Sequence, residues 1–508
     1  MAAPMQEHVA SEKWITERGV SFRNDYGDTP LEKSKLHNPK LLIFRELILA
    51  TVSELSRTKE TPLYAVDTSS GSGVAGMQWK KHLKGQGHVT ITDSSPNNCV
   101  KHNCSKNDLQ VSTLTPDLCR PPGLPLEGQD DNTLHVCQAL PHVVLQMEAF
   151  DFVYLDPHKN STSYFGPVFA NIKNNGVVSL VVPNVSGFAR TPHIVLRNYS
   201  ANVIKTDYTK EMAARIVTAC MARSAASCNK GIEVLFCASL EDFLLVTVRV
   251  LRGPGHADVS VRLVRHLLHC QICEERQFYP DQKAPVEDPY SLLPCDCHVT
   301  SPGKTAVVLG PMWCGDIFNT DFLTRMAPRA DSLKISVKTK SLLSALIEES
   351  FCYRLKGEQC VMSSSVMAVE DSMLQQDNGT ENDNIDEEVN KSKVNSQSRK
   401  RECVAECDTK TKKMKAEKVD EEKDTTKGGP LSNFASKGRQ PDICPPFYCS
   451  TLQRKKYRDI TVPKIDRMVT LLRSSGYRAS RTHFDAVATR TDANLKQIYA
   501  VLKQHCSN

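Results

Sequence analysis

Residues 63–76 read LYAVDTSSGSGVAG and join an apolar, β-rich run to a glycine-rich turn. The run ends in Asp67, and Gly71, Gly73 and Gly76 follow it with the spacing Gly-x-Gly-x-x-Gly. Glycines let the backbone of such a turn approach a ligand without a Cβ clash, so the pattern indicates the first βα unit of a nucleotide-binding sheet. Glycine-rich turns also occur in plain loops, and the motif alone selects no cofactor.

Strand-like and helix-like segments alternate through residues 60–250. The β-rich runs lie at residues 63–68, 88–93, 150–156 and 176–184, and helical stretches such as 74–83 and 97–107 lie between them. This alternation predicts βαβ crossovers and a parallel sheet covered by helices. Residues 232–253 read as two apolar strands joined by a short turn, which predicts an antiparallel edge. The expected fold class is therefore α/β and Rossmann-like.

The bulk composition indicates an intracellular protein with more than one domain. The chain has 508 residues, of which 40% are hydrophobic and 24% charged, and this length exceeds one ordinary core. It contains no apolar run of about 18 residues and no basic-then-apolar leader, so we expect neither a membrane span nor secretion. Its 19 cysteines, an odd number, do not predict a disulfide framework in such a chain.

Residues 367–440 differ in character from the rest. They contain almost no aromatic residues and carry blocks of like charge. They cannot bury enough apolar surface to offset the entropy of ordering, so we expect a disordered insert. Two basic clusters within it, at residues 399–401 and 412–415, resemble a bipartite nuclear-import signal and predict a nuclear protein. A solvated charged linker is an equally good interpretation of these clusters alone.

The C-terminal segment is basic. Residues 451–508 contain 12 Lys and Arg against four Asp and Glu, a local charge of +8 that suits a polyanion. Short helical stretches, the last at residues 492–505, predict a small helical or winged-helix-like module. Arg478, Arg481 and Arg490 are its candidate phosphate contacts.

A second carboxylate, Asp93, ends the next β-rich run, 26 residues after Asp67. In a doubly wound sheet the ligand lies beyond the carboxyl ends of the strands, and an acid there can accept the hydroxyl hydrogens of a ribose. The spacing suits either a dinucleotide or S-adenosylmethionine.

Residues 154–165, YLDPHKNSTSYF, distinguish between these two cofactors. A buried run ends here in Asp156, Pro157 and His158, where amino-methyltransferases hold a planar amine. The lone pair of an exocyclic base amine is delocalised into the ring, and a carboxylate that accepts its N–H bond can receive the released proton. A flat side chain nearby can stack on the base. The alternative, that Asp156 only caps the next helix, has equal weight on these residues alone.

Two cysteine-containing pairs predict a metal site. Residues 270–273 read CQIC and residues 295–298 read CDCH, with zinc-ribbon spacing between the pairs. No open coordination position or general base accompanies them, so the expected zinc is structural, and buried free cysteines are the alternative. The expected ligands are Cys270, Cys273, Cys295 and a fourth that is either His298, which keeps a two-residue gap, or Cys297.

Together these motifs resemble the tRNA guanine-N2 methyltransferase family, whose members make N2-methyl- and N2,N2-dimethylguanosine, and within it the vertebrate tRNA methyltransferase 1-like branch. The resemblance covers most of the chain outside the insert. Its further matches are HNPKLLIFREL from His37, KEMAARIV from Lys210 with Glu211 and Arg215, GPMW from Gly310, and HFDAVATRTDAN from His483.

The resemblance implies S-adenosylmethionine as methyl donor and tRNA as partner, with no DNA and no membrane expected. Asp156 would be the catalytic acid or base, with Pro157 and His158 beside it, and Arg45 would contact the methionine carboxylate of the cofactor. Cys-x-x-Cys pairs in the family favour His298 as the fourth zinc ligand. The cofactor-binding residues that the resemblance implies are Arg45, Asp67, Gly71, Gly73 and Asp93.

The same resemblance divides the chain into four parts. Residues 1–255 would form the S-adenosylmethionine-dependent methyltransferase domain, and residues 256–366 the zinc-ribbon part of the C-terminal RNA-binding domain. The insert at 367–440 would separate this part from a basic helical RNA-binding module at 441–508.

The chain departs from the family pattern near the expected base site. An aromatic residue and a glycine usually follow the Asp-Pro pair, but here His158 and Lys159 follow, and the fifth strand ends in Pro183 and Asn184. The first hypothesis is therefore a tRNA guanine-N2 methyltransferase, and the second is a tRNA-binding protein on the same fold without catalysis. A nuclear zinc-containing protein-interaction factor ranks third.

Overall fold

The protein is described by a computed structural model. It covers residues 14–23, 37–69, 71–93, 99–114, 132–157, 161–280, 288–301, 303, 305–353, 447–450, 460 and 462–506. His158, Lys159 and the two basic clusters of the insert lie outside these residues, so the expectations made for them stay predictions.

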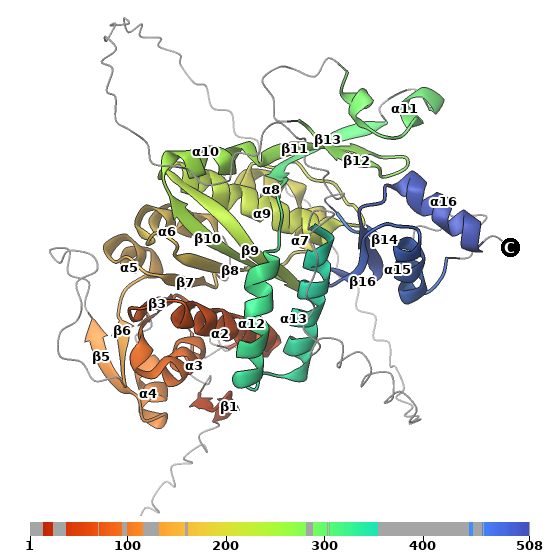
Figure 1. The fold of residues 1–508 in the computed structure, drawn as a ribbon. Coiled ribbons are helices and arrows are strands. Elements are labelled where there is room, and N and C mark those ends of the chain that lie inside the picture. Colours follow the sequence, from red (N-terminus) through yellow and green to blue (C-terminus); the bar gives the residue numbers. More distant parts are fainter. Residues whose placement is uncertain are drawn as a thin grey trace, which may run out of the picture. The chain divides into compact units, whose positions relative to one another are not determined.

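Eight strands form the central sheet, in the order β5-β6-β4-β3-β7-β8-β10-β9 (Figure 1). The strands from β3 to β8 pair in parallel, and β10 runs antiparallel to both β8 and β9. The Rossmann-like sheet with an antiparallel edge is thus confirmed, and β5 and β6 add to the predicted strands. The bounds are β3 Leu63–Asp67, β4 Gly87–Thr92, β5 Gln110–Leu114, β6 Thr133–Cys137, β7 Phe152–Leu155, β8 Val177–Pro183, β9 Lys230–Leu240 and β10 Phe243–Arg252.

Helices cover the sheet in two groups. One group packs around α2 and consists of α2 Leu42–Arg57, α3 Val74–Leu83, α12 Thr320–Ser332 and α13 Val337–Ser350, with α4 Cys99–Lys106 beyond them. The other packs around α9 and consists of α5 Pro141–Met147, α6 Phe165–Asn171, α9 Thr209–Ala226 and α10 Pro254–Arg262. Both α2 and α9 are buried along most of their length, because each lies between the sheet and a further layer of structure.

A short hairpin precedes the sheet. It consists of β1 Ile15–Glu17 and β2 Val20–Phe22, and the 3₁₀ helix η1 Pro39–Leu41 leads from there into α2. The hairpin contacts α3 and α4 through β2. The side chain of Asn107, which follows α4, accepts the backbone N–H of Ser21 at 2.9 Å and so ties the hairpin to this layer.

A second, three-stranded sheet follows α10 in the order β12-β11-β13. Its strands are β11 Val264–Cys270, β12 Arg276–Phe278 and β13 Ala306–Trp313, and the short helix α11 Cys297–Thr300 lies in the connection. Strand β13 packs on α9, and the chain then returns to α2 through α12 and α13. Residues 320–350 therefore complete a helix layer of the central sheet, although they lie within the range predicted for the zinc-ribbon part.

The C-terminal residues form two helices and a three-stranded sheet in the order β14-β16-β15. A small core of its own contains the buried Met468, Leu472, Ile498 and Leu502. The elements are β14 Cys449–Ser450, α15 Ile465–Ser474, β15 Ala479–Thr482, β16 Asp485–Thr491 and α16 Leu495–Cys506. Strand β15 contacts α13 of the preceding part of the chain.

A buried charge cluster joins this module to the rest. The guanidinium of Arg490 donates to Glu349 at 2.6 Å and to Glu211 at 2.7 Å, and Arg215 pairs with Glu211 at 2.9 Å. The side chains of all four residues are fully buried. Burial alone would raise the pKa of Glu349, but Arg490 and His483 hold it at about 2.

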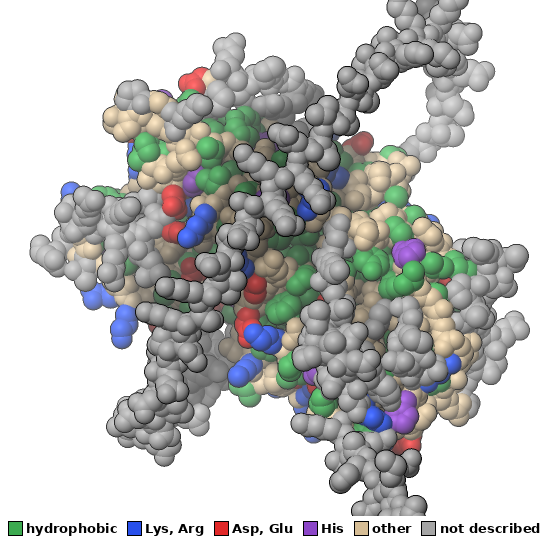
Figure 2. Space-filling view, turned by 180° about the vertical axis from the view of Figure 1, so that it is seen from behind, with side chains coloured by type: hydrophobic (Ala, Val, Ile, Leu, Met, Phe, Trp, Pro, Cys, Tyr) green, Lys and Arg blue, Asp and Glu red, His purple; other side chains and the backbone are tan. Residues whose placement is uncertain are grey.

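This cluster corrects one of the sequence-based expectations. Arg490 was a candidate phosphate contact, and its burial makes it a structural residue instead. Arg478 and Arg481 lie nearer the surface but pair with Asp492 and Asp466. On the face shown in Figure 2, Lys and Arg side chains likewise lie in small groups beside Asp and Glu. None of the helices in the described part of the chain has the length and apolar composition of a membrane span.

Candidate active site

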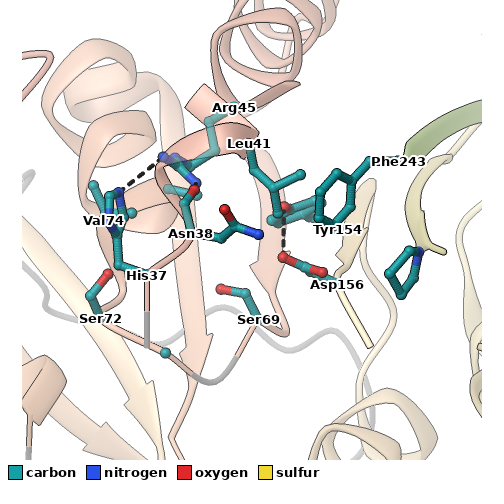
Figure 3. Close-up of a pocket in the computed structure, with 13 residues that line it drawn as sticks. His37, Asn38, Leu41, Arg45, Ser69, Ser72, Val74, Tyr154, Asp156 and Phe243 are labelled. Carbon is teal, nitrogen blue, oxygen red and sulfur yellow. Dashed lines mark hydrogen bonds between the residues drawn. The ribbon is translucent and has the colours of Figure 1, made fainter. Parts of the chain in front are cut away.

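The site lies where the order of the strands reverses. Strand β3 has β4 on one side and β7 on the other, and Asp67 at its end stands opposite Tyr154 of β7. Ligands of open α/β sheets bind beyond the carboxyl ends of the strands at such a point. A pocket occupies this place (Figure 3). Its lining residues are His37, Asn38, Leu41, Arg45, Ser69, Gly71, Ser72, Val74, Ala75, Tyr154, Asp156, Pro183 and Phe243.

The half-buried Asp156 follows β7 directly and lines the pocket. The hydroxyl of Tyr154 donates to its Oδ2 at 3.4 Å (Figure 3). Burial and the nearby charge of Asp67 raise the pKa of Asp156 to about 6, against the opposing influence of Arg45 and the Tyr154 hydrogen bond. Asp156 is therefore ionised at neutral pH and close enough to its pKa to accept a proton readily.

Asp67 is fully buried and organises the glycine-rich turn. Its Oδ1 accepts the backbone N–H of Ser69 at 3.0 Å and the Ser69 hydroxyl at 2.6 Å, and its Oδ2 accepts the backbone N–H of Gly76 at 3.0 Å. Burial raises the pKa of Asp67, and these hydrogen bonds oppose the rise. Both oxygens of Asp67 are thus directed at the protein, and Asp67 is not among the pocket residues.

The three glycines of the turn serve different purposes. Gly71 lines the pocket. Gly73 has φ of 74°, in the left-handed region, and a Cβ there would lie 3.0 Å from Cγ1 of Val100. A Cβ on Gly76 would lie 2.6 Å from Cγ1 of Ile91, so Gly76 allows α3 to pack closely on β4. Only Gly71 is therefore placed for direct contact with a ligand in the pocket.

Asp93 lies at the end of β4 and is buried. Its backbone N–H donates to the carbonyl of Cys137 at 2.9 Å, which fixes this end of the strand. It does not line the pocket defined by the described residues, and residues 94–98, which follow it, lie outside them.

Ser72 contributes an unused polar atom. Its Oγ is buried and has no hydrogen-bond partner within the described part of the chain. An unsatisfied buried hydroxyl costs free energy, and a polar ligand in the pocket would satisfy it. The pocket residues therefore fit a polar ligand bound against the glycine turn.

Arg45 enters the pocket from α2 and pairs with a residue that the sequence analysis missed. Its Nε donates to Oε1 of Glu17 at 2.8 Å, and its Nη2 donates to Oε2 at 2.5 Å. Glu17 belongs to the three-residue strand β1, and no local sequence signal marks it. Only the packing of the hairpin beside α2 brings the two residues together.

Four thiols meet at one end of the second sheet. The sulfur atoms of Cys270, Cys273, Cys295 and Cys297 all lie within 4.8 Å of one another. His298, which was expected as the fourth ligand, is not in this group, and its ring stacks on Tyr290 at 5.7 Å between centroids. Cys297 and His298 are the first two residues of α11, and the side chain of Cys297 is the one grouped with the other three thiols.

Comparison with known proteins gives a consistent result. Residues 25–374 match the family model described as N2,N2-dimethylguanosine tRNA methyltransferase. The human tRNA (guanine(27)-N(2))-dimethyltransferase is 35% identical over 486 residues, which cover 94% of this chain and 61% of the relative. The mouse protein of the same name is 36% identical over 488 residues, covering 94% of this chain and 61% of the relative. The chain thus spans about three fifths of the length of these relatives.

More distant matches agree with the fold. A tRNA (guanine(26)-N(2))-dimethyltransferase of Methanobrevibacter smithii is 22% identical over 307 residues, 59% of this chain and 71% of the relative. The structure of Trm1 from Pyrococcus horikoshii in complex with S-adenosyl-L-methionine aligns with a TM-score of 0.61 at 15% identity, covering 98% of this chain and all of the other.

Proposed function

Because the chain belongs to the family of N2,N2-dimethylguanosine tRNA methyltransferases, we propose that it transfers methyl groups from S-adenosylmethionine to the exocyclic N2 of a guanosine in tRNA. The names of the vertebrate relatives support dimethylation and guanosine 27 as the target. The observation that carries the proposal is Asp156, a carboxylate with a pKa of about 6 in the pocket at the carboxyl end of β7.

The reaction requires that the guanine amine be positioned against the methyl group and that a proton acceptor lie beside it. S-adenosylmethionine supplies a methyl group on a sulfonium, so the N–CH₃ bond forms as the S–CH₃ bond breaks. In this proposal Asp156 accepts an N–H bond of the guanine amine, which directs the nitrogen lone pair toward the methyl group, and then takes the proton. Pro183 and Phe243, which line the same pocket, offer an apolar wall for the flat face of the base.

The cofactor would lie against the glycine turn. Arg45, Gly71 and the unsatisfied hydroxyl of Ser72 support its placement there. Asp67 would act by holding the turn. Asp93, at the end of the adjacent strand, is proposed for the ribose hydroxyls.

We also propose a structural zinc ion bound by Cys270, Cys273, Cys295 and Cys297. The mutual distances of the four sulfur atoms suit tetrahedral coordination. Leu268 and Leu293 pack around the thiols in a small apolar cluster, which suits a closed structural site.

Binding of tRNA would use the basic C-terminal module. Lys464 and Arg467 are exposed at the start of α15 and are candidates for phosphate contacts. The sequence of the insert supports a nuclear location, because its two basic clusters resemble an import signal.

The test is mass spectrometry of modified nucleosides, position by position, in tRNA from cells that lack the protein. Re-expression of the wild-type chain is expected to restore an N2-methylated guanosine, whereas Asp156→Asn at equal protein level is not. Persistence of every N2-methylated guanosine in the cells without the protein would overturn the proposal. Binding of tRNA without methylation would then favour a non-catalytic RNA-binding role.

A further inference from the structure

The N-terminal hairpin supplies a carboxylate to the wall of the pocket. Glu17 and Arg45 form a two-point ion pair, at 2.8 Å and 2.5 Å, and both side chains are more than nine-tenths buried. Ion pairs of this geometry fix the plane of the guanidinium as well as its position. Glu17 therefore determines where Arg45 points.

The pair leaves one nitrogen of Arg45 for a ligand. Nε and Nη2 face Glu17, and Nε2 of His37 lies 3.0 Å from Nη2 on the same side. Nη1 donates one hydrogen to the carbonyl oxygen of Asn38 at 3.0 Å. Its second hydrogen has no partner within the described part of the chain, and Arg45, Asn38 and His37 all line the pocket (Figure 3).

Glu17 is itself held in place by α3. Nε2 of Gln78 donates to Oε1 of Glu17 at 3.0 Å and to its backbone carbonyl at 3.2 Å. The ammonium of Lys81 donates to the carbonyl of Gly19 in the hairpin turn at 2.8 Å. The carboxylate is thus anchored to the scaffold, and it can orient Arg45 without moving toward it.

Two other carboxylates would compete for Arg45 if Glu17 were absent. The charge of Arg45 opposes the rise that burial causes in the pKa of both Asp67 and Asp156, which is consistent with an attraction between Arg45 and these carboxylates. Without Glu17, the side chain of Arg45 would be attracted to these carboxylates. Holding it in the position seen here would then cost side-chain conformational entropy.

We propose that Glu17 is a positioning residue, which holds Arg45 so that Nη1 alone presents an N–H to the carboxylate of the cofactor's methionine moiety. This inference rests on the proposed function, because it takes S-adenosylmethionine as the ligand. Through Glu17, the hairpin would favour ligands that carry a carboxylate at this end of the pocket.

The test compares two ligands with and without the carboxylate. Dissociation constants of S-adenosylmethionine and of its decarboxylated analogue are measured by calorimetry for the wild-type chain, Glu17→Gln and Arg45→Lys. The matched control is Glu233→Gln, because Glu233 is a carboxylate that pairs with Arg249 at 2.8 Å and does not line the pocket. Thermal melting of each variant reports any general loss of folding.

Glu17→Gln is expected to weaken S-adenosylmethionine binding about tenfold, the size of one charge-assisted hydrogen bond, and to change binding of the analogue less than about twofold. Arg45→Lys should show the same selectivity, and Glu233→Gln should leave both constants unchanged. Equal losses for both ligands, or tighter S-adenosylmethionine binding by Glu17→Gln, would overturn the inference alone. Failure of the wild-type chain to bind S-adenosylmethionine would overturn the proposed function and the inference with it.

Discussion

At the scale of single residues, Asp156 combines two properties that oppose each other. Burial and the neighbouring Asp67 raise its pKa to about 6, which suits a group that must take a proton near neutral pH. The same environment makes its charged form unfavourable in the folded protein. A substitution that removes the charge of Asp156 is therefore expected to lower the activity and to raise the stability.

The rate of methylation should fall as the pH falls through about 6, because only the ionised carboxylate of Asp156 can accept the proton. Tyr154→Phe removes a hydrogen bond that lowers this pKa, so the acidic limb should move to higher pH. Profiles of kcat/KM against pH for both proteins test the expectation. An acidic limb that stays in place in Tyr154→Phe would assign it to another group.

Asp156→Asn should melt at a higher temperature than wild type at pH 8. The folded pKa is above the value of 3.8 for an unperturbed aspartate, so the folded state resists ionisation more than the unfolded state does. The difference should shrink as the pH falls below 6, because the wild-type carboxyl then becomes neutral in the folded protein. Melting curves at pH 5 and pH 8 check this, and an equal difference at both values would contradict it.

At the scale of elements, the buried cluster around Arg490 links β16 to α9 and α13. Removal of Arg490 would leave Glu349 buried with His483 as its remaining ion-pair partner, and Glu211 buried with Arg215. A buried charge that loses one of its partners destabilises the fold more than an exposed one does, so the cluster helps to hold the C-terminal module on α9 and α13.

Arg490→Met is expected to lower the free energy of unfolding by about 3–5 kcal/mol, and Arg481→Ala, whose partner Asp466 is exposed, by less than about 1 kcal/mol. Urea titrations of both variants provide the measurement. Adding Glu349→Gln to Arg490→Met should recover part of the loss, because one buried charge is then removed. If Arg490→Met and Arg481→Ala had the same free energy of unfolding, the structural role of Arg490 would be contradicted.

The acid stability of this cluster follows from the pKa of Glu349. Its folded value of about 2 lies below the ordinary value of 4.5, so the stabilisation is complete above pH 4.5. It is lost as the pH falls from there toward 2.

At the scale of the whole molecule, the cysteine cluster and the pocket lie on different sheets. The pocket is built from β3, β7 and α2, whereas the thiols lie at the end of β11 and in the connection to β13. Arg276 of β12 donates to the carbonyl oxygens of Phe447 and Tyr448, so the second sheet also holds the start of the C-terminal module. Loss of a metal is therefore expected to affect the module more than the pocket.

Cys297→Ser should lose the proposed zinc ion and weaken tRNA binding, while the dissociation constant of S-adenosylmethionine changes less than about twofold. His298→Ala is the matched control and should keep one zinc ion per chain, because His298 stacks on Tyr290 outside the thiol group. Metal analysis and ligand titrations on the same preparations decide the matter. A loss of zinc in His298→Ala alone would restore the histidine as a ligand.

Features that depend on neighbouring residues could be predicted from the sequence alone. The helix predicted at 74–83 coincides with α3, and the strand runs coincide with β3, β4, β7 and β8 to within a few residues, because periodicity and glycine spacing act locally. The proximity of Gly71 and Asp156 also followed, since the ends of parallel strands meet at one edge of a sheet, whereas Arg45 on α2 was expected only from the family resemblance.

The pairing of residues that are distant in the sequence became evident only in the folded protein. Glu17 meets Arg45, and Arg490 meets Glu211 and Glu349, across long stretches of sequence with no local signal. Nor could spacing alone choose between Cys297 and His298; only the fold shows that the sulfur of Cys297 lies with the other three thiols, while the ring of His298 stacks on Tyr290. From the sequence alone a charged residue is expected to be exposed, and it needs an ion-pair partner only when the fold buries it.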